Sequence, residues 1–150
     1  MYYFYTMQYL KDTVFFREAI QELNYSFGNF YLFDGYVVGE INEDVVFTWD
    51  DHAKILVEHL TNLYDHNGGE IVYITNRVHS YAVKPSDWIK FYRSEYKLRA
   101  YGIVSYTPKG LMNVLLEKLF MRNKIKGFDT LGDAIHWAKV LTSVIRSKAS

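Results

Sequence analysis

Strand-like segments alternate with helical segments along most of this chain, and this order restricts its fold more than any other feature. Residues 70–75, Glu-Ile-Val-Tyr-Ile-Thr, form an apolar run between Gly68-Gly69 and Asn76-Arg77, which is typical of a buried central strand. Further strands are predicted at residues 98–106 and 125–128, and helices at residues 48–67, 85–94, 107–120 and 130–145. Strands separated by helices need crossover connections, so this order predicts a largely parallel sheet.

Capping residues mark where two of these helices begin and where one ends. Thr48 and Thr130 each stand three residues before an aspartate, a pattern that favours a helix start. The segment Asn67-Gly68-Gly69 would end the first helix, because glycine readily supplies the left-handed residue found at helix ends.

The first part of the chain carries a hairpin signal. Asp34-Gly35 separates two runs of aromatic and β-branched residues, and this dipeptide favours a tight turn between antiparallel strands. Strands are therefore predicted at residues 26–33 and 36–42, followed by a short extended piece at 45–47. Residues 8–23 are predicted to be helical, because apolar residues recur there at helix-like intervals.

The complete order predicts a single α/β domain over residues 1–150, with a mixed, mostly parallel sheet, an N-terminal β-hairpin and about four helices. Its core is expected at residues 25–146, behind an N-terminal extension of residues 1–23. Met7 is an alternative start, in which case residues 1–6 are not part of the native protein. A domain of this length buries enough apolar surface to fold without disulfides.

Composition excludes several classes of function. The chain has no cysteine, so disulfides, thiolate metal sites and cysteine nucleophiles are excluded, in keeping with a cytoplasmic location. Basic and acidic residues both number 17, so there is no net positive field to hold nucleic acid. No apolar run reaches the roughly 20 residues of a membrane span.

Aromatic residues are frequent, with 14 tyrosines and 10 phenylalanines, and many lie near the predicted hairpin. Such residues suit half-buried sheet faces and interfaces. If those of the hairpin were exposed, a monomer would carry an apolar patch there, so a homodimer is predicted.

The loop after the central strand is the best candidate for a binding site. In parallel α/β sheets, ligands meet the carboxyl ends of strands, where helix N-termini offer free N–H groups. Residues in this stretch able to contact a ligand or partner are Asn76, Arg77, His79, Ser80, Tyr81 and Lys84. Arg77 would bind a phosphate or carboxylate bidentately. The alternative is structural, with Asn76 in a turn, Arg77 paired to a carboxylate and Tyr81 packed.

Glu40 is a lone carboxylate in an otherwise apolar strand. A buried carboxylate without a partner is costly, so Glu40 is expected to pair with Arg77 or Arg99, or to face water. A general base with a raised pKa is the functional alternative. An enzyme built on Glu40, Arg77 and Ser80 requires these side chains to converge on one cleft.

No metal or cofactor is expected. His52, His59 and His66 recur every seventh residue of one predicted helix, which places neighbours roughly 10 Å apart from the 1.5 Å rise per residue. Metal–nitrogen bonds of about 2 Å cannot span that distance. Gly102 and Gly110 are isolated, so no glycine-rich loop for a nucleotide is present.

Three segments resemble a known family. They are Val38-Gly39-Glu40-Ile41-Asn42, then Tyr73-Ile74-Thr75-Asn76-Arg77 with Ser80 to Val83 and Pro85, and Phe128-Asp129-Thr130-Leu131 with Ala134-Ile135 and Trp137. With the element order, they resemble the STAS-like fold of anti-sigma-factor antagonists, and more closely the small bacterial branch, common in Bacteroidetes, that is grouped with STAS and CRAL-TRIO lipid-transfer domains.

The resemblance implies a non-catalytic regulatory or protein-interaction module of the bacterial cytoplasm. In the antagonist family a serine at the start of the second main helix is phosphorylated, within an Asp-Ser-Ser/Thr-Gly loop. Ser80 and Ser86 are the positional matches here, although neither has that context. The CRAL-TRIO comparison implies the runner-up, a small lipid- or metabolite-binding domain with a closed apolar cavity of roughly a few hundred Å³.

Overall fold

A six-stranded mixed sheet forms the centre of the computed structural model, which describes residues 7–79, 81–84, 86–107 and 124–149. The strand order is β1-β2-β3-β5-β7-β8. The bounds are β1 Gln21–Tyr25, β2 Gly28–Leu32, β3 Tyr36–Ile41, β5 Val72–Arg77, β7 Ala100–Ser105 and β8 Lys124–Phe128. Strands β1 to β3 are antiparallel, and β3, β5, β7 and β8 are parallel. This confirms the predicted α/β class and the mostly parallel, mixed sheet.

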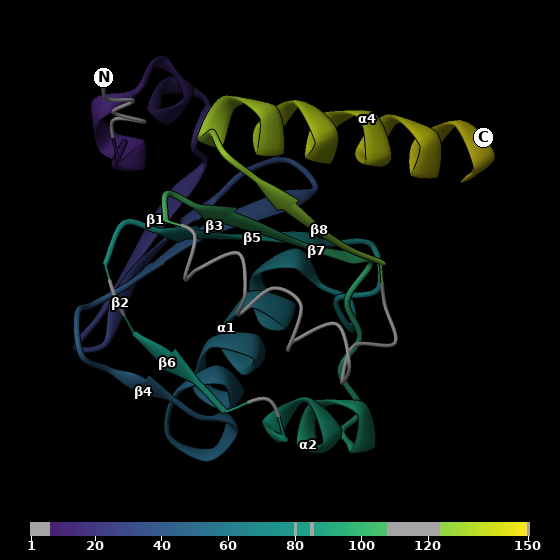
Figure 1. The fold of residues 1–150 in the computed structure, drawn as a ribbon. Coiled ribbons are helices and arrows are strands. Elements are labelled where there is room, and N and C mark those ends of the chain that lie inside the picture. The colour runs from purple at the N-terminus through teal and green to yellow at the C-terminus, as the bar shows by residue number, and fades with distance from the viewer. Residues whose placement is uncertain (1–6, 80, 85, 108–123, 150) are drawn as a thin grey trace.

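The two faces of the sheet are covered by different elements (Figure 1). Helix α4 (Leu131–Ala149) and the 3₁₀ turns η1 (Leu10–Asp12) and η2 (Val14–Glu18) lie on one face. Helix α1 (Lys54–Tyr64), helix α2 (Asp87–Arg93) and the small β4–β6 pair (Val46–Phe47, Ala82–Val83) lie on the other. Each of β5 and β7 pairs beside the preceding parallel strand in the same direction across the sheet, so right-handed crossovers bring the connecting helices α1 and α2 to one face.

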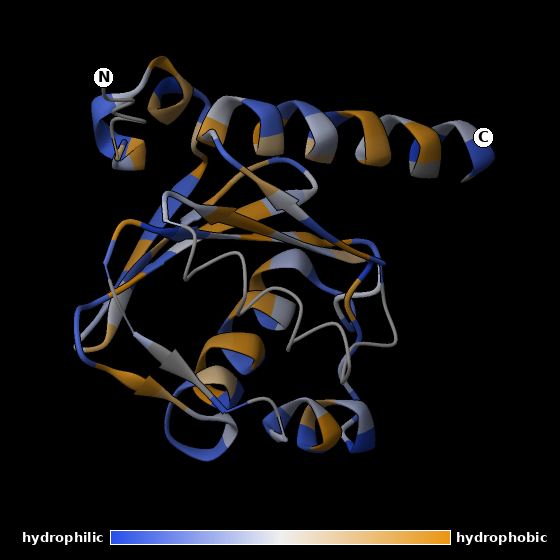
Figure 2. Ribbon diagram, in the orientation of Figure 1, coloured by the Kyte–Doolittle hydropathy of each residue, from blue (hydrophilic) through white to orange (hydrophobic). Residues whose placement is uncertain are grey.

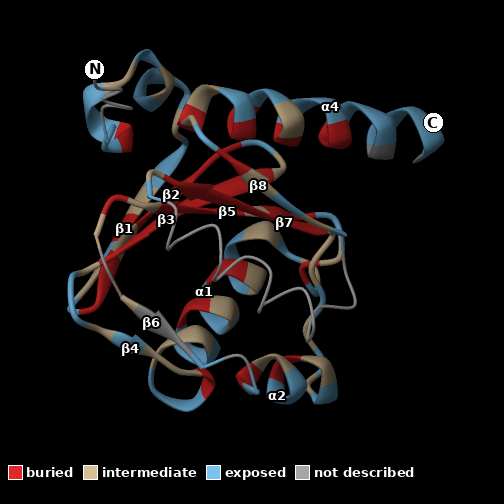
Figure 3. Ribbon diagram, viewed as in Figure 1, coloured by how far each residue is buried: buried red, intermediate tan, exposed pale blue. Residues whose placement is uncertain are grey.

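Hydrophobic residues concentrate in the strands of the sheet, and buried residues lie in the strands and on the side of α4 that faces the sheet (Figures 2 and 3). Toward α4, Val38 and Ile74 are buried in one cluster with Ile135. Toward α1, Val37 is buried in a second cluster with Leu56. Because both faces of the sheet are covered, β3 and β7 are buried at every residue and are mostly apolar, whereas β5 is buried at four of its six residues.

The hairpin prediction is confirmed. Asp34-Gly35 connects β2 to β3 with Gly35 at a φ of 87°, and the N–H of Phe33 donates to the Tyr36 carbonyl at 2.9 Å. The aromatic side chains of this hairpin are inside the molecule, because Phe30, Tyr31, Phe33 and Tyr36 are all buried. The hairpin therefore lacks the exposed aromatic patch on which the homodimer prediction was based, and that expectation is wrong. The oligomeric state itself stays a prediction.

Both capping threonines begin helical segments as predicted. The side-chain oxygen of Thr48 accepts from the N–H of Asp51 at 3.2 Å, and Thr130 accepts in the same way from Asp133. A π turn at Trp49–Ala53 separates Thr48 from α1. The predicted glycine end is wrong, since α1 ends at Tyr64 and Asp65 takes the left-handed conformation with a φ of 58°.

The predicted helix at residues 8–23 is wrong. Two short 3₁₀ turns occupy its first part, and its last residues form β1, which pairs with β2 along its whole length. Pairing to the exposed edge of β2 satisfies the backbone of Gln21–Tyr25 better than an isolated helix would. Leu10 is fully buried against the sheet, so the hydrophobic core includes residues well before 25.

Helices α1, α2 and α4 agree with three of the four helices predicted after residue 47, and the fourth, at residues 107–120, lies outside the described residues apart from Thr107. Among the described helices, none combines the length and the apolar character needed to cross a membrane.

Candidate functional site

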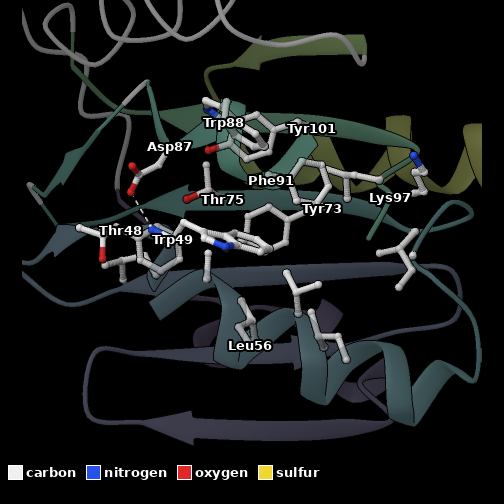
Figure 4. Close-up of a pocket in the computed structure, with 18 of the residues that line it drawn as sticks. Thr48, Trp49, Leu56, Tyr73, Thr75, Asp87, Trp88, Phe91, Lys97 and Tyr101 are labelled. Atoms are coloured by element: carbon white, nitrogen blue, oxygen red, sulfur yellow. Dashed lines mark hydrogen bonds between the residues drawn. The ribbon is translucent and has the colours of Figure 1, made fainter. Parts of the chain in front are cut away.

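An apolar pocket of about 120 Å³ lies between the sheet and helices α1 and α2. Its floor is formed by strand residues and its sides by the two helices, as Figure 4 shows. The lining side chains on which the argument depends are Ala53, Leu56, Tyr73, Thr75, Tyr81, Lys84, Asp87, Trp88, Phe91, Lys97 and Tyr101.

Aromatic rings build one wall of the pocket. Tyr73 of β5 and Tyr101 of β7 are paired across the parallel strands and stack with centroids 5.7 Å apart and planes 4° apart. Trp88 of α2 meets Tyr101 edge to face at 5.0 Å and Phe91 at 5.8 Å. Tyr73 and Tyr101 point to the same side of the sheet, and Trp88 and Phe91, three residues apart, lie on the same face of α2. The rings of the strands and of the helix therefore face one another.

The π turn Trp49–Ala53, which leads into α1, meets the start of α2 at one end of the pocket. The carboxylate of Asp87 accepts from the backbone N–H of Trp49 at 2.7 Å, and Asp87 is buried. The Trp49 ring in turn packs on Phe91 at 5.9 Å. Lys90, one turn along α2, lies 3.9 Å from Asp87 and 2.9 Å from Asp50. This bonding fixes the spacing of the two helices.

Polar groups gather beside the aromatic wall at the carboxyl end of β5. The hydroxyls of Thr75 and Tyr81 are 2.6 Å apart. The guanidinium of Arg77 lies 5.2 Å from the Tyr81 ring centroid and donates to the Tyr101 hydroxyl at 3.5 Å. The indole N–H of Trp88 is buried, and the described residues offer it no hydrogen-bond acceptor.

No family model matches the chain, and no curated protein or solved structure matches it.

The sheet separates the predicted site residues into two groups. Tyr81 and Lys84 line the pocket, and Arg77 contacts two of its tyrosines. Asn76 and Glu40 lie on the opposite face, next to the N-terminal segment. Neighbouring residues of β5 point to opposite sides, so Asn76 and Arg77 cannot serve one ligand.

His79 also belongs to the N-terminal side, where its Nε2 lies 3.3 Å from the Tyr9 hydroxyl. Ser80 lies outside the described residues, whereas Ser86 is exposed just before α2.

Glu40 is buried without the arginine partner that the sequence suggested, so that prediction is wrong. Its Oε2 accepts from the backbone N–H of Leu10 and from the side-chain amide of Asn76, both at 2.8 Å. The same Asn76 amide donates to the Gln8 carbonyl at 2.8 Å, and its oxygen accepts from Tyr106 at 2.7 Å. Burial raises the pKa of Glu40, and the hydrogen bonds from Leu10 and Asn76 oppose this shift.

The convergence on one cleft that the Glu40, Arg77 and Ser80 hypothesis requires is not found for Glu40 and Arg77, and Ser80 lies outside the described residues. Glu40 and Arg77 lie on opposite faces of the sheet and do not share a cleft. Asn76 is fully buried within β5 and holds the N-terminal segment, rather than forming the turn predicted for it.

The three histidines spaced by seven residues, His52, His59 and His66, each have a structural contact. His52 Nδ1 accepts from the Thr48 N–H at 3.0 Å, and His66 Nδ1 accepts from the Gly68 N–H at 2.9 Å. His59 Nδ1 lies 2.6 Å from the Tyr25 hydroxyl. Within the part of the chain that the structure describes, no three His, Asp or Glu side chains are grouped for a metal ion.

Sequence reasoning missed the aromatic wall, which is the main feature of the pocket. Trp49 and Trp88 each follow a predicted helix start, and Tyr73 and Tyr101 occupy matching positions of two predicted strands. Tryptophans at the first turns of two helices on one side of a sheet were the available signal.

Proposed function

We propose that this protein is a non-catalytic binding domain that takes the apolar body of a small molecule in the pocket between the sheet and helices α1 and α2. The pocket itself carries the proposal. It is lined mainly by aromatic and aliphatic side chains, with a few polar groups at its ends, as small-molecule sites are.

The volume limits the size of the ligand. An apolar cavity of about 150 Å³ stays dry and binds benzene, and the pocket here measures about 120 Å³. It is smaller than the closed cavity of a few hundred Å³ expected for a lipid carrier, and the lipid-binding alternative stays a prediction. A single ring or a short branched chain fits, whereas a whole acyl chain does not.

Binding is tested by titrating the full chain with toluene and with indole while recording proton–nitrogen NMR spectra. Saturable shifts are expected for the indole N–H groups of Trp49 and Trp88 and for the backbone of α1. The Trp137 indole lies in the other layer and serves as an internal control.

A variant that fills the pocket, compared with a matched control variant, tests whether ligands bind there. Ala53→Leu adds side-chain volume at a lining position, whereas Lys54→Leu adds the same side chain at an exposed neighbour. Ala53→Leu is expected to weaken toluene binding at least about tenfold, and Lys54→Leu to leave it unchanged. Shifts that do not saturate, or equal binding by both variants, would contradict the proposal.

The regulatory STAS-like role inferred from the resemblance stays a prediction, as does phosphorylation of Ser80 or Ser86. Ser86 is exposed next to the pocket, so a kinase could reach it. Intact-mass measurement on protein from its native cells would detect a phosphoserine.

A further inference from the structure

We infer that the molecule bound in this pocket is a small organic acid, with a carboxylate at the Tyr81 end and an apolar body of about the size of a benzene ring. This inference rests on the proposed function and adds the chemical class of the ligand. Three features of the described residues carry it: a hydrogen-bond donor without an acceptor, a second available proton and the balance of charge.

The donor is the indole N–H of Trp88. It is buried, and it has no acceptor among the described residues. A buried donor in this state destabilises the folded protein, and few native donors are left so. Trp88 lines the pocket, and Figure 4 shows it beside Tyr101 and near Thr75. On this inference, an acceptor oxygen of the ligand binds this N–H.

The second proton comes from the hydroxyl pair. The oxygens of Thr75 and Tyr81 are 2.6 Å apart, so one hydroxyl donates to the other. Two hydroxyls carry two protons, and their mutual bond uses one of them. The other is available to an oxygen at the same end of the pocket. A carboxylate accepts several hydrogen bonds and donates none, which suits this set of donors.

The charges at the pocket favour an anion. Lys84 and Lys97 line it, and Asp87 is the carboxylate among its described lining residues. Asp87 already accepts from the Trp49 N–H at 2.7 Å and lies 3.9 Å from Lys90. Arg77 adds positive charge behind the Tyr81 ring. Figure 4 shows Lys97 at the opposite end of the pocket, so the cations considered near the carboxylate are Lys84 and Arg77, which favour an acid over an organic cation.

The apolar part of the acid would point away from these donors. Leu56, Tyr73 and Phe91 provide the surface for it, and Figure 4 shows them between Asp87 at one end of the pocket and Lys97 at the other. Two of these side chains are aromatic, which suits a flat ring in the ligand.

Three ligands of similar size and different charge separate the alternatives: phenylacetate, 2-phenylethanol and 2-phenylethylammonium. Each is titrated into the full chain at pH 7 by calorimetry, with ligand-observed NMR for weak binding. Phenylacetate is expected to bind about tenfold or more tightly than the alcohol, and the ammonium ion most weakly, because charge-assisted hydrogen bonds are stronger than neutral ones.

Variants assign the effect to the proposed donors. Trp88→Phe keeps an aromatic ring and removes the N–H, and Lys84→Gln removes a charge from an exposed lining position. Each is expected to weaken phenylacetate several-fold and to leave 2-phenylethanol unchanged. Lys139→Gln, on helix α4 in the other layer, is the control and is expected to change neither affinity.

The outcomes distinguish this inference from the proposed function. Equal affinity for all three ligands, or preference for the ammonium ion, overturns the acid and leaves the binding function standing. Binding of none of them at millimolar concentration overturns the binding function as well. If Trp88→Phe alters the circular dichroism spectrum, Lys84→Gln decides, and unchanged phenylacetate affinity in that variant overturns the inference.

Discussion

At the scale of single residues, Glu40 shows how a buried carboxylate is accommodated without a cation. Two neutral donors, the Leu10 N–H and the Asn76 amide, bind its Oε2, while Asp12 and His79 are the nearby groups that act on its charge. Desolvation outweighs these bonds, so the pKa of Glu40 is raised from 4.5. Glu40 therefore positions the N-terminal segment at some cost in stability near neutral pH.

This raised pKa gives a pH prediction for Glu40→Gln. The folded protein holds the Glu40 proton more tightly than the unfolded chain, so its contribution is most favourable below about pH 4.5 and is lost as the pH rises through the raised folded value. The free energy of unfolding of the wild type, measured with urea from pH 4 to pH 8, is expected to fall relative to Glu40→Gln as the pH rises. A difference that is constant with pH, or that grows in the opposite direction, would contradict this account.

At the scale of secondary-structure elements, turns and caps decide where strands and helices begin. Gly35 has a positive φ in the turn between β2 and β3, and a Cβ built there would lie 2.5 Å from the Thr142 side chain on α4. The hairpin turn thus combines a backbone requirement with a packing contact to another layer. Gly132, near the start of α4, has neither constraint, since its nearest neighbour is Phe15 at 3.7 Å.

The two glycines form a matched pair of substitutions. Gly35→Ala is expected to lower the free energy of unfolding by about 1–3 kcal/mol, because alanine is strained at positive φ and meets Thr142. Gly132→Ala is expected to leave stability unchanged or raise it by up to about 1 kcal/mol, because alanine favours the helix. Chemical denaturation of both variants measures this, and equal effects at the two sites would rule out the explanation.

At the scale of the whole molecule, the sheet separates the pocket from the N-terminal segment. Its α1 and α2 face holds the pocket, whereas its α4 face anchors the N-terminal segment through Leu10 and the Glu40–Asn76 hydrogen bonds. The segment also reaches α4 directly, since Lys139 donates to Glu18 at 3.0 Å. The N-terminal residues thus complete the second layer of the fold.

Leu10→Ala tests this anchoring. Removing a fully buried leucine side chain is expected to cost about 2–5 kcal/mol and to speed trypsin cleavage after the exposed Arg17. Val14→Ala changes a side chain that is 67% exposed in the same segment, so little effect is expected. Cleavage at Arg17 that is equally fast in both variants would show that Leu10 does not hold the segment.

Local chemistry was enough to predict the turn at Asp34-Gly35 and the helix starts at Thr48 and Thr130, because periodicity and capping act over a few neighbouring residues. The central strand was predicted at residues 70–75, and the structure places it two residues later, at Val72–Arg77. The pairing of Gln21–Tyr25 with β2 needed the three-dimensional fold, since an available strand edge outweighs a weak helical pattern. The same holds for the two sides of the site. Which face Glu40 and Arg77 occupy depends on strand register, and the pocket arises only when distant strands and helices pack together.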